Sequence, residues 1–166
     1  MAKKQDKGLD NLFHDTLKDI YFAEKKILTA LPKMAKAAQS PDLKNAFMRH
    51  QGETENQVGR LEQVFRIIDE KPRGKTCAAI MGIVEEGQEI MKEYKGTRAL
   101  DAGLLAAAQA VEHYEISRYG TLKAWAQELG HAQAVRLLDQ TLTEEKHTDA
   151  TLSKIAESAI NQRAED

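Results

Sequence analysis

The chain repeats part of its own sequence at an interval of 91 residues. Residues 20–64 align without a gap on residues 111–155, and these stretches share five identical pairs: Glu24 and Glu115, Leu31 and Leu122, Ala35 and Ala126, Glu53 and Glu144, and Leu61 and Leu152. Self-similarity at a fixed interval is typical of a duplicated structural unit. We therefore expect two halves of one architecture, joined by a segment without a counterpart.

The first half has the periodicity of two helices. Apolar residues recur at steps of three and four between about Leu9 and Ala38, which is the spacing of one helix face, and Glu24 interrupts this stripe. The run Ser40-Pro41-Asp42 then breaks the chain, and proline suits the first turn of a new helix. That second helix should continue to about Asp69.

The second half follows the same plan. Helices are expected from about Arg98 to Leu129 and from about Ala132 to Ala159, with Gly130 suited to the position after the end of the former. The intervening stretch 70–97 contains a loop and a shorter apolar helix over 76–94. The sequence thus predicts an all-α fold in one domain, 1–166: a four-helix bundle of two hairpins, 9–69 and 98–160, with a short extra helix in the crossover 70–97.

Charge and cysteine content exclude several functional classes. The 24 basic and 26 acidic residues are mixed along the chain and give a net charge of −2, which argues against nucleic-acid binding. Cys77 is the single cysteine, so a disulfide framework is excluded and a reducing compartment fits. No apolar run approaches the ~18 residues of a membrane span, and no signal peptide is evident. We expect a cytoplasmic protein.

Four glutamates are predicted to meet in one layer of the bundle. Glu24 and Glu53 lie 16 and 13 residues from Ser40, and Glu115 and Glu144 lie 15 and 14 residues from Gly130. At ~1.5 Å per helical residue, each pair is level within roughly 5 Å. Carboxylates packed in a core repel one another, so they must be protonated or neutralised by cations. Two divalent cations would cancel four negative charges, and iron or manganese suits such ligands.

The last helix offers a further ligand. His147 follows Glu144 by three residues, so both should lie on one helix face as an oxygen and a nitrogen donor. One Glu from each of two helices, together with Glu-x-x-His on the other two, is the ferritin-like di-iron pattern.

The sequence resembles the ferritin-like di-iron carboxylate superfamily from about residue 9 to 160. The runs Phe47-Met-Arg-His50-Gln-Gly-Glu53-Thr54, Arg60-Leu-Glu-Gln-Val-Phe65 and Glu112-His-Tyr-Glu115 are similar to its YciF-type branch, whose members are bacterial stress-associated proteins. The resemblance implies two divalent metals, iron foremost and manganese as an alternative. It implies these metal ligands: Glu24, Glu53, Glu115, Glu144 and His147.

One position departs from that pattern. The second helix should carry His three residues after Glu53, but residue 56 is Asn. His50 lies one turn before Glu53, and Glu112 precedes Glu115 by three residues, as in the paired glutamates of rubrerythrin-like proteins. His50, Glu112 or a water molecule could complete the site, and the sequence does not choose among them.

Three functions remain open. A di-metal centre could react with peroxide or dioxygen as an oxidoreductase in a stress response; its sustained turnover with dioxygen would need an unknown electron donor. Ferritin-type iron handling and a metal-free structural bundle that binds a partner protein are the alternatives. We expect a homodimer, with no nucleic-acid or membrane partner.

Overall fold

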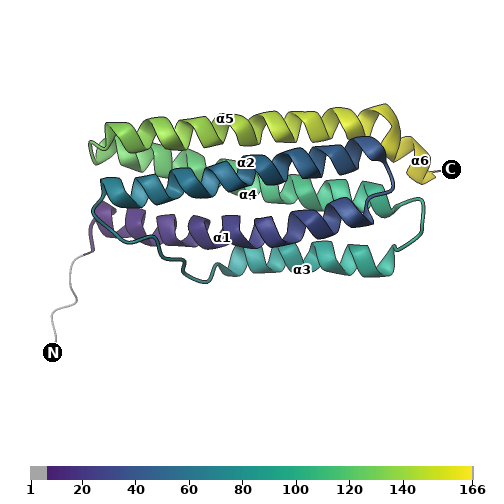
Figure 1. Cartoon of the computed structure of the whole chain (residues 1–166), viewed down its shortest axis with the longest axis horizontal. Coiled ribbons are helices and arrows are strands. Elements are labelled where there is room, and N and C mark those ends of the chain that lie inside the picture. The colour runs from purple at the N-terminus through teal and green to yellow at the C-terminus, as the bar shows by residue number, and fades with distance from the viewer. Residues whose placement is uncertain (1–6, 166) are drawn as a thin grey trace.

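Four long helices run side by side along the molecule (Figure 1). The structure is a computed structural model and describes residues 7–165. The long helices are α1 (Leu9–Ala37), α2 (Pro41–Ile67), α4 (Leu100–Glu128) and α5 (Ala132–Ile155). The described residues contain no strand, so the predicted all-helical class is confirmed. No described helix is both long and apolar enough to cross a membrane.

The repeat is visible in the helix bounds. Helices α1 and α4 each have 29 residues and begin at Leu9 and Leu100, while α2 and α5 begin at Pro41 and Ala132. Both pairs of starting points are separated by the repeat interval. In space, α1 contacts α2 and α4, and α5 contacts the same two helices, so the four form a closed ring.

The connecting segment supplies one more helix. Helix α3 (Ala78–Glu93) packs against α1 and α4 and covers the seam between them (Figure 1). Its buried Gly87 faces Ala107 of α4 closely, with 3.6 Å between an added Cβ and the alanine Cβ. An alanine at this position would therefore make an ordinary van der Waals contact with α4.

Helix ends are fixed by specific contacts. The Asp101 carboxylate of α4 accepts hydrogen bonds from the backbone N–H groups of Gln39 and Ser40, at 2.8 and 2.7 Å, and so ties the start of α2 to α4. Gly130 has φ +76°, the left-handed conformation expected after the end of a helix. After α5 the chain remains helical: a π-helical turn, η1 (Ala156–Ile160), leads into α6 (Asn161–Glu165).

The core is apolar towards both ends and polar in its middle. Buried aromatic and aliphatic side chains fill the ends, for example Phe13 and Leu61 at one end and Leu43 and Leu104 at the other. The polar middle consists of buried side chains from all four long helices: Glu24, His50, Thr54, Gln57, Glu112, Glu115, Thr141, Glu145 and Thr148. Buried polar groups destabilise a fold unless they are paired or bind a ligand, so this layer needs a chemical explanation.

Candidate metal centre

Helices α1 and α4 bring two repeat-related glutamates into the core. Glu24 and Glu115 are both fully buried, as predicted, and their carboxyl groups lie beside each other. The Tyr119 hydroxyl, one turn along α4 from Glu115, donates a short hydrogen bond to Glu24 Oε1. No donor from another described residue contacts Glu24 Oε2 or the two oxygens of Glu115, and the two carboxyls can share a hydrogen bond when one of them is protonated.

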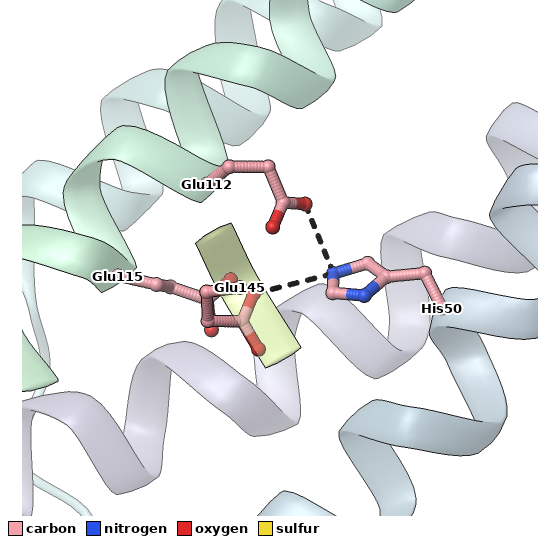
Figure 2. A group of neighbouring side chains, drawn as sticks. All are labelled: His50, Glu112, Glu115 and Glu145. Carbon is pink, nitrogen blue, oxygen red and sulfur yellow. Dashed lines mark ion pairs between the residues drawn. The ribbon is translucent and has the colours of Figure 1, made fainter. Parts of the chain in front are cut away.

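The structure places both His50 and Glu112 in this layer. His50 Nε2 lies 3.0 Å from Glu112 Oε1 and 3.9 Å from Glu145 Oε2, contacts drawn in Figure 2. Both side chains are almost completely buried. Asn56 itself is exposed and donates to the Gly52 carbonyl oxygen of its own helix.

Helix α5 is rotated by one residue from the orientation that we predicted. Its buried carboxylate is Glu145, which is fully buried and points at His50 and Glu115 (Figure 2). The adjacent Glu144 lies at the edge of the interface and pairs with Arg60 of α2 through two 2.6 Å hydrogen bonds. His147 is exposed. The expectation that Glu144 and His147 face the core layer was wrong, because the inward face of α5 passes through Glu145 and Thr148 instead.

Glu53 lies beside the core layer, not inside it. Its side chain is 28% exposed, and Oε2 is 3.5 Å from His50 Nδ1 and accepts a hydrogen bond from Thr148 at 3.3 Å. Glu53 therefore reaches the same imidazole as Glu112 but from the solvent side. It is the one carboxylate of the group with direct contact to water.

The inward positions of α2 next to His50 are occupied by neutral side chains. Thr54 and Gln57 are both fully buried. The Gln57 amide donates to Glu145 Oε1 in a short hydrogen bond and to Glu144 Oε2 at 3.2 Å. Because 54 and 145 are related by the repeat interval, Thr54 stands where the other half has its buried glutamate. The site is consequently asymmetric, with its carboxylates concentrated on α1, α4 and α5.

Five buried carboxylate oxygens have no hydrogen-bond partner among the residues that the structure describes: Glu24 Oε2, Glu112 Oε2, both oxygens of Glu115 and Glu145 Oε2. Single ligand atoms of His50, Glu112, Glu115 and Glu145 lie within 4.8 Å of one another. The His50 nitrogens approach carboxylates at ion-pair distance but without the angles of a hydrogen bond. Oxygen and imidazole donors that converge on a small volume in this way could hold a metal ion.

Burial strongly perturbs the protonation of the cluster. It raises the pKa of Glu24 to about 7, although the Tyr119 hydrogen bond opposes the change. Burial raises the pKa of Glu145 to about 10, with the nearby Glu112 carboxylate contributing. The pKa of Glu115 also lies well above its usual range, through burial and its acidic neighbours. Without a cation, the Glu115 and Glu145 carboxyls therefore hold protons at neutral pH, whereas Glu24 gains and loses its proton near neutral pH.

The pKa of the His50 imidazole is raised, although burial alone would lower it. Burial by itself lowers the pKa of His50, but the carboxylates of Glu112 and Glu53 outweigh that effect and raise it well above the usual value. The same contact with His50 lowers the pKa of Glu53. A protonated His50 thus takes the role of a cation in the metal-free layer, and a metal would have to replace its proton.

Residues 8–165 match the family described as "Domain of unknown function (DUF892)". The chain belongs to the DUF892 family. It is 41% identical over 160 residues to Protein YciF of Escherichia coli strain K12, and the match covers 96% of each chain. The similarity shows a family relationship over almost the entire sequence.

Solved structures of relatives have the same fold as this DUF892 chain. The crystal structure of the E. coli stress protein YciF is 40% identical with a TM-score of 0.89, covering 94% of this chain and 99% of that one. YcfI from Rhodopseudomonas palustris, described as a candidate structural protein, is 44% identical with a TM-score of 0.87. The match covers 92% of this chain and 98% of that one. A protein from Xanthomonas campestris, 20% identical with a TM-score of 0.71, shares the fold alone.

Proposed function

We propose that this protein is a di-metal carboxylate protein of the bacterial stress response. The two metals are divalent iron or manganese, and they react with peroxide or dioxygen. In this proposal the ring of four long helices is a ferritin-like bundle. The ligands are Glu24, Glu112, Glu115, Glu145 and His50, with Glu53 at the solvent edge. The description of the E. coli relative as a stress protein supports the physiological setting.

The unpaired buried carboxylate oxygens are the observation on which the proposal depends. Isolated carboxylates in a low-dielectric interior are destabilising by several kcal/mol each, whereas bridging by cations removes that penalty. Four fully buried glutamates carry up to four negative charges, which two divalent ions would neutralise. The mixture of oxygen donors with one imidazole favours iron or manganese over softer metals.

When bound, such metals supply electron exchange and two adjacent positions for the oxygen atoms of a substrate. The protein side chains would have separate tasks. Tyr119 holds Glu24 in one orientation through its hydrogen bond. Gln57 does the same for Glu145. Glu53, with its contact to His50 and its exposure to solvent, is placed to pass protons between water and the buried layer.

Metal analysis of the purified protein tests the proposal. After expression in medium supplemented with iron or manganese, we expect about two metals per chain, the number that balances four carboxylates. Glu145→Ala should abolish the binding while leaving the helix content intact. Glu144→Ala provides the matched control one residue away and should retain the metals. Occupancy below ~0.3 per chain in the unmodified protein would overturn the di-metal proposal.

A metal-free structural role is the second candidate. The description of the R. palustris relative as a candidate structural protein favours it. The raised pKa values of Glu24 and Glu145 would then simply keep these carboxyls neutral. In that case Glu145→Leu should stabilise the fold, because a hydrophobic side chain replaces a buried polar one without losing a ligand.

A further inference from the structure

A narrow apolar pocket connects the protein surface with the His50–Glu112 pair. Its walls come from α1, α3 and α4, and include Ile27, Val84, Met91 and Ala107. Lys33 and Gln88, both exposed, stand at its outer part, whereas the buried His50 and Glu112 line its inner part. The pocket therefore leads from solvent to the candidate metal centre beneath α3.

The size of the pocket restricts what can occupy it. The centre of a water-sized sphere can move through about 30 Å³ of the pocket. A single water needs ~10–15 Å³ by this measure, whereas pockets for drug-sized ligands hold ~300–1,000 Å³. The space thus fits a diatomic molecule and excludes ordinary organic substrates.

The chemistry of the walls selects among small molecules. Carbon atoms line almost all of the pocket. A buried water needs two to four polar partners, and empty apolar cavities stay dry and take up xenon. Hydrogen peroxide has the same need for hydrogen bonds as water. Dioxygen is apolar and little larger than water, so it is the oxidant that this pocket favours.

We propose that the pocket beneath α3 is the route by which dioxygen reaches the metal centre. This inference depends on the proposed function, and it selects dioxygen over peroxide as the molecule that enters from this side. Peroxide and protons have a different, polar approach at Glu53, which is 28% exposed on the side chain. The two oxidants would then enter through different walls of the same site.

Xenon binding to the metal-free full-length protein tests the pocket without any catalysis. Xenon should shift the methyl NMR signals of Ile27, Val84 and Ala107. Val84→Phe, which fills the pocket from α3, should weaken xenon binding at least ~10-fold, equivalent to ~1.4 kcal/mol. Val135→Phe makes the same change on a half-buried valine of α5 outside the pocket and should leave xenon binding unchanged. Ala30→Leu fills the pocket from α1 and serves if Val84→Phe does not fold.

The route itself is tested with protein loaded anaerobically with ferrous iron. In stopped-flow measurements, Val84→Phe should slow the reaction with dioxygen at least ~10-fold, while iron content and the rate with hydrogen peroxide stay as in the unmodified protein. Absence of xenon from the pocket, or an unchanged dioxygen rate in a variant that excludes xenon, would overturn the inference. A protein that binds no metal would instead refute the proposed function, and the route with it.

Discussion

The raised pKa of Glu145 predicts how the stability of the metal-free protein changes with pH. Its pKa is raised from 4.5 to about 10 in the folded state, chiefly by burial. As pH rises, the unfolded chain therefore releases this proton first. The free energy of unfolding falls from about pH 4.5 upwards until the pKa of the folded state is reached. The metal-free protein is therefore less stable at neutral pH than at acidic pH.

The magnitude follows from the two pKa values. The free energy of unfolding falls by ~3 kcal/mol between about pH 5 and pH 7.5, because Glu145 keeps its proton in the folded state and loses it in the unfolded state. Glu24, whose pKa is raised to about 7 by burial, would contribute ~2 kcal/mol over the same interval if it titrated independently. The two carboxyls interact, so these values do not add, and we expect a total loss of at least ~3 kcal/mol.

The assay is urea unfolding in EDTA, followed by circular dichroism at several pH values. Glu145→Gln should remove ~3 kcal/mol of the pH dependence, because the amide does not titrate. Glu144→Gln, the same change one residue away at the edge of the α2–α5 interface, is the matched control. Saturating Mn²⁺ should reverse the trend, since metal binding requires deprotonated carboxylates. A metal-free stability that stays flat or rises between pH 5 and 7.5 would refute the burial argument.

Three further substitutions test individual contacts. His50→Ala should reduce metal occupancy, as measured by elemental analysis, whereas His147→Ala on the exposed face of α5 should leave it intact. Tyr119→Phe removes the hydrogen bond to Glu24 and should destabilise the metal-free protein by ~1 kcal/mol in urea unfolding, with its metals retained; an unchanged stability would show that the bond contributes nothing. Arg60→Ala should lower stability by ~1–3 kcal/mol, because the pair is mostly buried, with the Arg60 and Glu144 side chains 13% and 27% exposed, and its loss leaves the Glu144 carboxylate without its charged hydrogen-bond donor; metal content should be unaffected.

The helices were predictable because their signals are local. Apolar spacing, Pro41 and Gly130 placed the long helices within two residues of the observed ends, except at the end of α5, which stops at Ile155 and not near Ala159. The repeat also predicted that Glu24 and Glu115 meet in the core, since both interrupt otherwise apolar stripes. These features depend on neighbours in the chain, which the sequence displays directly.

The orientation of α5 was harder to predict because its inward face is partly polar. Two glutamates stand next to each other at 144 and 145, and the identity between Glu53 and Glu144 favoured the wrong one. A step of seven residues from the buried Leu138 leads to Glu145 and then to the buried Leu152, so the heptad spacing contained the correct answer. Arg60, which holds Glu144 at the edge, comes from another helix and gives no local signal.

The two seams of the helix ring, where one hairpin meets the other, are closed in different ways. The two hairpins meet along two different seams, one between α1 and α4 and the other between α2 and α5. The second side is closed by the Arg60–Glu144 ion pair, and the first is roofed by α3, the segment that belongs to neither copy. Mutations confined to residues 78–93 could therefore change which molecules reach the centre while every ligand stays in place, so access and chemistry could evolve separately.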